Sequence, residues 1–439
     1  MTRRFHGVAI LLIFVCGPSF SQENPVTVLG PEERAAVIEA ICENLEQDYI
    51  FPDITERYVQ TLTENLRSGI YGEIDDPQEF AGAITRDLAR VHEDRHLRVQ
   101  FDPEWVAEER NRKELEQEAI ERKGWRARTT NYGFEKIEIL PGNIGYLELN
   151  SFSYEPDAYE VAAGAMSFLA NTDALIVDLR SNGGGSPEMV QFLCSYFLEN
   201  PRKHLNSFTY RDPGKLTQYW TYTYLPGRRL GDVKLFVLTS ENTFSAAEEF
   251  AYNLKSLQRA VVVGETTGGG AHDNRFVVLT DRFMMSLPFA RAVNPVTQDN
   301  WEEVGVEPDV TVARDMALRT ALALASASLA EIEGQPYVEA FHTWYRDIYE
   351  SELHPTSLNE SALQAYIGTY GPRTITLEDG ALFYQRQGRS KMKMIPMGLG
   401  LFRFEEPDWF RLRFLKEGDN IVAVEGLTPD GRNDIHTRD

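Results

Sequence analysis

The chain has 439 residues, 42% of them hydrophobic, which is enough for a large core divided over two or three domains. Its formal net charge at pH 7 is −23. This argues against nucleic acid and anionic membranes as main partners, because both are polyanionic and repel such a chain.

The first 21 residues have the pattern of a cleaved export signal. Arg3 and Arg4 give a basic start, residues 8–15 form an apolar run too short to span a bilayer, and residues 19–21 are a small-x-small cleavage site, Ser-Phe-Ser. We therefore expect an exported protein, periplasmic or secreted, that is free of the membrane after cleavage. The alternative is a lipid anchor on Cys16, which fits less well because a small residue is expected before such a cysteine.

Residues 22–130 are predicted to form an N-terminal helical module. Apolar residues recur at helical spacing in three stretches, and from residue 97 they alternate with polar ones, which indicates a strand. The predicted elements are helices over 31–45, 54–66 and 76–92, a strand over 97–101 and a highly charged helix over 104–128.

Residues 131–335 alternate between strand and helix patterns, which predicts an α/β domain. Repeated strand–loop–helix units favour a mostly parallel sheet with its loops at the carboxyl edge of the strands. The predicted strands span 144–149, 174–179, 233–238 and 260–263, with a strand pair over 276–279 and 282–287, and the predicted helices span 160–169, 187–198, 246–257 and 315–332.

The rest of the chain has a different character. A helix over 339–352 and a polar turn belong to a connecting segment, residues 336–360. In residues 361–439, short apolar and aromatic runs are separated by turns, and Asp379-Gly380 between two such runs is a strong hairpin signal. We expect a small antiparallel β domain with an aromatic interior.

Two cysteines, Cys42 and Cys194, remain once the signal is removed. An oxidising compartment would allow them to pair. Both lie in helical apolar patterns, however, and we expect two buried free thiols.

Ser245 lies where a strand gives way to a helix. It follows the apolar run 233–238 and a polar turn, and residues 246–257 have helical spacing. A hydroxyl at this place is next to free first-turn amides and the positive end of the helix dipole, which can hold a developing oxyanion. Serine is also a favoured N-cap, and the local pattern alone favours that structural role.

Two further features bear on chemistry. The glycines at 183–185 follow a predicted strand, where the backbone can approach a ligand closely. They are not a phosphate cradle, because no Gly-Lys-Ser/Thr follows. His96 lies at a helix-to-strand junction after an acidic pair, although a lone histidine is more often structural.

Four motifs in chain order make the sequence resemble a known family. They are D-L-R-S-N-G-G-G, T-S-E-N-T-F-S-A-A-E-E-F, G-E-T-T-G-G-G-A-H and N-W-E-E-V-G-V-E-P-D-V. They resemble the C-terminal processing (tail-specific) protease family of serine peptidases, most closely its branch with the tricorn protease core and the interphotoreceptor retinoid-binding protein repeats. The resemblance covers roughly residues 30–330, and it implies a Clp protease/crotonase-like core of stacked β-β-α units.

The resemblance also implies roles for individual residues. It places the nucleophile at Ser245 and the oxyanion-binding amides at Gly184 and Ala246. The tail-specific branch uses a lysine base at the position of Gly270, so that Ser-Lys dyad is absent here. The tricorn-like branch instead uses a histidine and a glutamate, and these fall on His96 and Glu302.

The sequence departs from the tricorn-like pattern at the link between His96 and Glu302. In the tricorn-like pattern a hydroxyl residue precedes the histidine and joins it to the glutamate, whereas this chain has Arg95 there. Asp94 is therefore the alternative carboxylate to orient His96. His272 belongs to a recurrent family stretch, and the sequence assigns it no role.

The expected function is an exported serine peptidase that acts on peptide or protein substrates through an acyl-enzyme, without a cofactor and with a possible homo-oligomeric state. Two other functions compete with it. His92-Glu93-Asp94-Arg95-His96 fits H-E-x-x-H, the pattern of a zinc peptidase, but this requires both histidines on one continuous helix. The retinoid-binding relatives raise the other, a scaffold that binds apolar ligands or peptides without catalysis.

Overall fold

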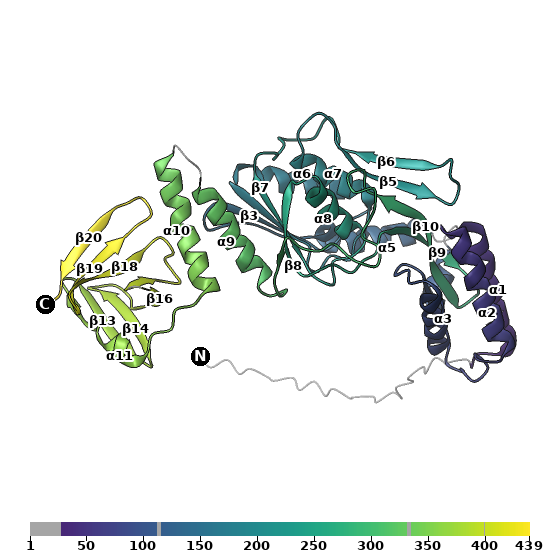
Figure 1. Cartoon of the computed structure of the whole chain (residues 1–439), viewed down its shortest axis with the longest axis horizontal. Helices are drawn as coiled ribbons and strands as arrows, with labels where there is room; N and C mark the ends of the chain where they lie inside the picture. The colour runs from purple at the N-terminus through teal and green to yellow at the C-terminus, as the bar shows by residue number, and fades with distance from the viewer. Residues whose placement is uncertain (1–27, 112–115, 332–334, 399) are drawn as a thin grey trace, which may run out of the picture.

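The computed structural model describes residues 28–111, 116–331, 335–398 and 400–439 (Figure 1). The expected export signal and the alternative anchor at Cys16 lie outside the described residues. Within the described ranges, no helix combines the length and the apolarity needed to cross a bilayer.

The core is a six-stranded sheet with the strand order β11-β8-β7-β4-β3-β2. All neighbours pair in parallel except the hairpin of β2 and β3. The strands are β2 (Phe134–Leu140), β3 (Ile144–Leu149), β4 (Ala174–Asp178), β7 (Lys234–Thr239), β8 (Ala260–Gly264) and β11 (Val310–Thr311).

Helices cover both faces of this sheet, because its central strands are apolar on both sides. On β4, Leu175 and Val177 pack into one hydrophobic cluster, and Ile176 between them packs into the other. The first cluster holds α6 (Ala158–Phe168), α7 (Pro187–Phe197) and α8 (Ala246–Ser256), and the second holds α9 (Ala317–Ala330) and α10 (Pro336–Leu353).

A second sheet joins the N-terminal helices to the core. Its order is β1-β10-β5-β6, and β9 also pairs with β10. Phe283, Met285 and Leu287 alternate along β10 and pack into the core of the N-terminal helices. The elements are α1 (Pro31–Asp48), α2 (Pro52–Arg67), α3 (Pro77–Val91), β1 (Arg98–Phe101), β5 (His204–Tyr210), β6 (Leu216–Trp220), β9 (His272–Val278) and β10 (Phe283–Val293).

The C-terminal region forms a separate aromatic core beyond α10 (Figure 1). One antiparallel sheet joins β12 (Gly368–Tyr370), β13 (Arg373–Glu378), β14 (Ala381–Arg386) and β15 (Met392–Lys393). A second joins β16 (Ile395–Gly398), β17 (Leu401–Arg403), β18 (Arg411–Glu417), β19 (Asn420–Leu427) and β20 (Asn433–Thr437). The short helix α11 (Glu360–Gln364) precedes them.

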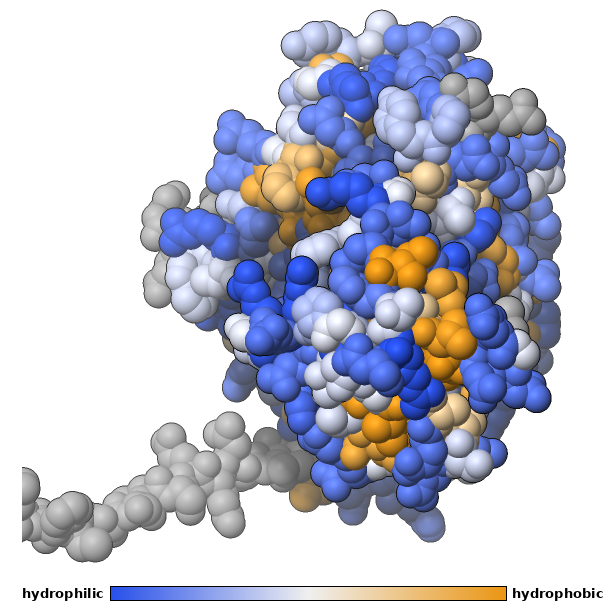
Figure 2. All heavy atoms as spheres, turned by 90° about the vertical axis from the view of Figure 1, so that its left-hand side faces the viewer, coloured by the Kyte–Doolittle hydropathy of each residue, from blue (hydrophilic) through white to orange (hydrophobic). Residues whose placement is uncertain are grey.

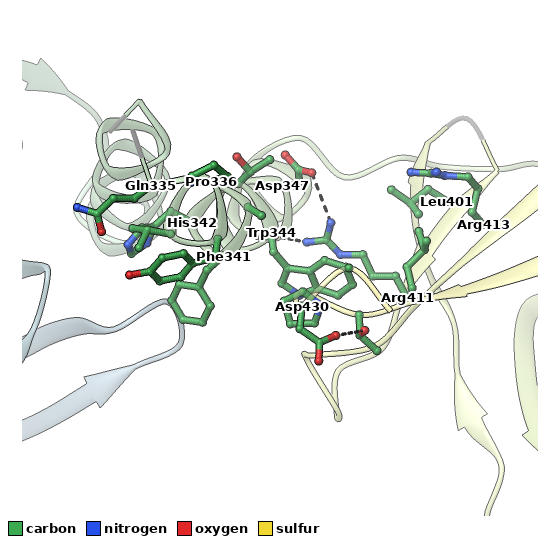
Figure 3. A pocket seen from close by; sticks show the side chains of 18 of the residues that line it. Gln335, Pro336, Phe341, His342, Trp344, Asp347, Leu401, Arg411, Arg413 and Asp430 are labelled. Carbon is green, nitrogen blue, oxygen red and sulfur yellow. Dashed lines mark hydrogen bonds and ion pairs between the residues drawn. The ribbon is translucent and has the colours of Figure 1, made fainter. Parts of the chain in front are cut away.

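Helix α10 connects this β region to the core. The guanidinium of Arg411 lies 3.8 Å above the Trp344 ring and is ion-paired with Asp347 at 3.4 Å (Figure 3). These residues line a largely apolar cleft of about 1140 Å³ between α10 and the β region. The contact with Trp344 fixes where the β region begins relative to the core helices.

The coarse architecture predicted from the sequence is confirmed: a mixed α/β core, N-terminal helices and a C-terminal antiparallel β region. The expected charged helix over 104–128 is two helices, α4 (Pro103–Arg110) and α5 (Glu116–Thr129). The expected strand over 282–287 continues to Val293, because a bulge after Pro288 lets pairing resume. Cys42 is half-buried, Cys194 is buried, and both are free.

Candidate active site

Three loops leave neighbouring strands of the core sheet at the same edge. The loop after β4 carries the glycines at 183–185, the loop after β7 leads to Ser245, and the loop after β8 leads to Gly270. Because parallel strands end at one edge of the sheet, these three loops meet there.

Ser245 is the residue immediately before α8, and its backbone is strained. Its φ and ψ are 54° and −121°, a region that residues with a side chain rarely adopt. A sharp turn between strand and helix is thereby fixed at the serine. The side chain is half-buried at the mouth of a cleft.

Glu248, one turn into α8, holds the turn together. It is completely buried, and its carboxylate accepts hydrogen bonds from the amides of Ser245 (2.8 Å), Gly269 (2.6 Å) and Gly270 (2.9 Å) and from the hydroxyl of Thr267 (2.5 Å). Burial raises the pKa of Glu248 to about 7, although these donors oppose the shift. One carboxylate therefore ties the serine to the loop after β8.

The glycine loop packs directly against the serine. A Cβ on Gly184 (φ 110°) would lie 2.8 Å from the Cβ of Ser245 and 3.1 Å from the Ala246 nitrogen. Ala246 N–H is a first-turn amide of α8, which has no acceptor within the helix. The amide of Gly184 donates instead to Oδ1 of Asn182 at 2.8 Å, so the oxyanion role expected of Gly184 requires that contact to open.

His96 reaches the cleft from the N-terminal helices. The pairing of β1 with β10 begins two residues later, at Arg98 opposite Ser286, and fixes where the histidine emerges. Its ring lies 4.7 Å from the Phe244 ring, centroid to centroid. A Cβ on Gly270 would lie 2.6 Å from Cε1 of His96, so the ring fills the space beside that glycine.

Three charged groups form a buried cluster behind His96. Asp94 Oδ1 accepts from the His96 backbone amide at 3.1 Å, and Asp94 Oδ2 lies 2.9 Å from Nδ1 of His272. Glu302 Oε2 accepts from the Ala271 amide at 2.5 Å and lies 3.6 Å from the same His272 nitrogen. The hydroxyl of Tyr49 donates to Asp94 Oδ2 at 3.0 Å.

The electrostatics of this cluster separate the two histidines. Burial lowers the pKa of His96 to about 4, with His272 acting in the same direction and Asp94 opposing it. The pKa of His272 is raised by its hydrogen bond to Asp94 against the cost of burial, and the pKa of Asp94 is lowered. Burial raises the pKa of Glu302 to about 7. His96 is therefore neutral near pH 7 and able to accept a proton.

Ser245, His96, Ala246, Gly185 and His272 all line one cleft of about 230 Å³. Two acids, Glu249 and Asp273, lie on its wall. Burial raises the pKa of Glu249 to about 8 and that of Asp273 to about 6. Nearby carboxylates act in the same direction, because Asp273 and Glu188 raise the pKa of Glu249 and Glu188 raises that of Asp273.

Ser245, His96 and Ala246 line this cleft as expected, but within the described ranges no hydrogen bond joins Ser245 to His96, and none joins His96 to Glu302. Among the described residues, Nδ1 of His96 and Oε1 of Glu302 are both buried without a hydrogen-bond partner, and Glu302 lies next to His272 instead. Arg95, at the position of the bridging hydroxyl, donates to the carbonyl of Gly268. Glu302 therefore does not orient His96 through a direct hydrogen bond, which the sequence led us to expect.

The helix required for a zinc site is also absent from the described N-terminal residues. Helix α3 ends at Val91, and His92 already has extended backbone angles of −160° and 127°. His92 and His96 therefore share no helical face. The described carboxylate and histidine groups close enough to hold a metal are Asp94, His272 and Glu302, and no pattern in the sequence indicated them as a ligand set.

Sequence reasoning missed Glu248, Asn182 and Phe244. Glu248 had a recognisable signal, because Ser245-Ala246-Ala247-Glu248 is a capping-box pattern in which the glutamate returns to the serine amide. Asn182 and Phe244 gave no such signal, since their contacts join loops that are distant in the sequence.

The sequence matches models of two known families. Residues 143–312 match peptidase family S41, and residues 32–130 match the N-terminal domain of Peptidase_S41 in eukaryotic IRBP. Similar curated proteins include carboxyl-terminal-processing proteases from Synechocystis, 30% identical over 179 residues, and from Picosynechococcus, 26% identical over 183 residues. These alignments cover 40% and 42% of this chain and the same shares of the relatives, so the chain spans about two fifths of the length of the curated relatives it matches.

The solved structures similar to this chain include two proteases. The photosystem II D1 C-terminal processing protease is 17% identical with a TM-score of 0.42, and the match covers 66% of this chain and 95% of that one. The tricorn protease is 14% identical with a TM-score of 0.41, and the match covers 72% of this chain and 37% of that one.

Proposed function

Because the chain belongs to peptidase family S41, a family of serine peptidases, we propose that it hydrolyses peptide bonds through an acyl-enzyme on Ser245. His96 is the general base, in place of the lysine used by tail-specific relatives. Asp94 supplies the negative charge that stabilises the protonated ring, with His272 and Glu302 behind it. The substrate is a peptide or protein, as the match to a peptidase family implies.

The observation that carries this proposal is the position of the His96 ring. It lies in the same cleft as Ser245 and against Gly270, the position at which the family resemblance would place the lysine base of the tail-specific branch. A side chain on residue 270 and the ring of His96 would compete for one space. The ring of His96 can therefore hold this position only because residue 270 is a glycine.

The chemistry follows from these positions. Nδ1 of His96 is buried without a hydrogen-bond partner, and in the proposed step the other ring nitrogen, Nε2, takes the proton from the Ser245 hydroxyl as its oxygen attacks the substrate carbonyl carbon. The carbonyl oxygen becomes an oxyanion and accepts from the Ala246 amide and an amide of the glycine loop. The C–N bond breaks as His96 returns the proton to the departing amine, and water then hydrolyses the ester with His96 again as base.

Covalent labelling tests this assignment. A fluorophosphonate reagent followed by peptide mapping is expected to modify Ser245, and Ser245→Ala is expected to lose both the label and peptide hydrolysis, while EDTA leaves activity unchanged. Modification of a different serine, or hydrolysis by Ser245→Ala, would overturn the assignment. Peptide binding with neither label nor hydrolysis would favour the non-catalytic scaffold, and loss of activity to EDTA with recovery on zinc would favour a metallopeptidase.

We further propose that the protein is exported with removal of residues 1–21, on the sequence pattern alone. N-terminal sequencing of the protein from its native host is expected to begin at Gln22. A start at Met1, or a lipid-modified Cys16, contradicts this proposal.

A further inference from the structure

The C-terminal β region has an unusual charge for this protein. Residues 361–439 contain 11 basic and 11 acidic residues, so the whole net charge of −23 lies in the first 360 residues. The basic groups are not evenly spread. Four arginines line one cavity of about 840 Å³, where Asp434 is the one carboxylate in its wall: Arg373, Arg386, Arg389 and Arg432.

Arg373 is buried on the floor of this cavity with most of its donors unused. The side chain is 2% exposed, and Nη2 donates to Asp434 at 2.5 Å. Its Nε and Nη1 have no hydrogen-bond partner among the described residues. Buried guanidinium donors without an acceptor are costly, since such a group normally satisfies them with an anion or carbonyl oxygens.

A second arginine stands directly beside it. In the register of β13 and β14, Arg373 lies opposite Arg386, and like charges facing each other across a strand pair destabilise a sheet. Arg389 follows in the turn after β14. In the described part of the chain neither Arg386 nor Arg389 forms an ion pair, whereas Arg432 is paired with Asp430 at 2.7 Å.

Space and apolar surface adjoin these charges. Gly426 on β19 lies against Arg373. A Cβ on residue 426 would lie 2.5 Å from Nη2 and 3.0 Å from Nη1 of Arg373, so the glycine leaves room for the guanidinium. Phe410 lies 5.7 Å from the same guanidinium, and Trp409 is 54% exposed at the cavity wall. Figure 2 shows that this end of the molecule is largely hydrophilic with apolar patches between.

We propose that this cavity binds a small anion whose oxyanion group, phosphate or carboxylate, is held by Arg373, Arg386 and Arg389. Its flat apolar part lies on Trp409 and Phe410. Arginine suits this task because its planar fork donates two parallel hydrogen bonds to such groups. The β strands that carry this site lie beyond α10, away from β7, β8 and α8 of the core (Figure 1), and the proposal does not depend on peptidase activity.

Calorimetric titration of the full chain tests the proposal with three probes: inorganic phosphate, phenyl phosphate and benzoate. Sodium chloride keeps the ionic strength constant. We expect phenyl phosphate or benzoate to bind, and the probe with the higher affinity identifies which oxyanion group, phosphate or carboxylate, the site prefers. Arg386→Gln and Arg389→Gln are each expected to weaken the binding of that probe at least tenfold. Trp409→Ala is expected to weaken the binding of the aromatic probes but not that of inorganic phosphate.

Arg413→Gln is the matched control, because Arg413 is exposed on the same β region and pairs with Glu425 outside the cavity. Arg386 and Arg389 are exposed, so their variants are expected to fold, and thermal unfolding checks this. The same probe should raise the melting temperature of the wild type and of Arg413→Gln only. Absence of binding at millimolar concentrations, or equal affinity in Arg386→Gln and Arg413→Gln, would overturn the proposal.

Discussion

The ring of His96 occupies space that a side chain on residue 270 would need, so its position depends on Gly270. Gly270→Ala would place a methyl group 2.3 Å from Cζ of Phe244 and 2.6 Å from Cε1 of His96. Both rings must then move, and we expect kcat/KM to fall by about 100-fold or more, since small misplacements of reacting groups are this costly. Gly164→Ala, where nothing lies within 4 Å of the new methyl group, is the control and should keep full activity. An active Gly270→Ala enzyme would mean that His96 is not the base.

The carboxylate that supports His96 can be identified by two amide substitutions. Asp94 bonds the His96 backbone and the His272 ring, whereas Glu302 has no direct bond to His96. Asp94→Asn is therefore expected to lower kcat by on the order of 10²–10⁴ and Glu302→Gln by only about tenfold, by analogy with the orienting aspartate of a serine triad. Steady-state kinetics on both folded variants would show which carboxylate supports His96. A more severe effect of Glu302→Gln would restore the Ser-His-Glu arrangement expected from the sequence.

The lowered pKa of His96 has a consequence for activity. The base must be neutral to accept a proton, and its pKa of about 4 keeps it neutral above that pH. We expect the acidic limb of kcat/KM to fall near pH 4 rather than near 6.5, the ordinary value for histidine. Rates measured from pH 3.5 to 8, with folding followed by circular dichroism, would show this. A limb near 6.5 would mean that His96 is more exposed in the working enzyme.

At the scale of single residues, the sequence was most informative where chemistry and pattern coincide. Ser245 and His96 were identifiable from motifs, and they line the same cleft. The sequence offered Glu302 and Asp94 as alternative supports of His96 but did not decide between them, because His272 and Glu302 come from segments distant from His96 in the sequence. Periodicity and spacing carry no information on which of two carboxylates a folded imidazole will contact.

Among the elements, helix α8 depends most on a single side chain. Glu248 accepts four hydrogen bonds, one from Ser245 at the start of the helix and three from the loop after β8. Glu248→Gln replaces one acceptor oxygen with an amide donor that faces other donors. We expect a loss of about 2–4 kcal/mol in the free energy of unfolding, since buried donors are left unpaired, and at least a tenfold loss of kcat. Chemical denaturation and kinetics would measure both.

The exposed neighbour Glu241 provides the control for that change. Glu241→Gln removes the same charge from the loop before Ser245, and we expect wild-type stability and activity because its side chain lies in solvent. Equal behaviour of the two variants would show that Glu248 is not the connection between the loops.

Element types were largely predictable because the strands and helices of the core have strong apolar periods. The strands β5 and β6 were not predicted, since polar residues such as Asn206, Ser207 and Gln218 interrupt their apolar pattern. The pairing of β1 with β10 was also beyond prediction. It joins residues almost 200 positions apart, and no local pattern records which strand a distant strand will choose.

On the scale of the whole molecule, the strong excess of negative charge includes several acidic residues that are buried around the cleft. The chain carries a net charge of −23, and the pKa values of four acids around the cleft are raised: about 8 for Glu249, about 7 for Glu248 and Glu302, and about 6 for Asp273. Burial is the largest cause in each case. At these four positions the folded chain therefore binds more protons than the unfolded chain across the pH range from about 4.5 to 8, whereas the lowered pKa of His96 acts in the opposite direction below about pH 6.5.

This excess of bound protons fixes the sign of the pH dependence. Where the folded state binds more protons, the free energy of unfolding falls as pH rises, and repulsion among the remaining negative charges acts in the same direction. We expect a higher melting temperature at pH 5.5 than at pH 8.5. Glu249→Gln provides the specific test, because Gln keeps the shape of the side chain, which is 2% exposed, and removes its titration. The variant should match the wild type near pH 4.5 and exceed it by about 3–5 kcal/mol at pH 9, as the shift to about 8 requires. Denaturant unfolding at several pH values would measure this difference, and parallel curves for the two proteins would show that Glu249 is not protonated in the folded state near neutral pH.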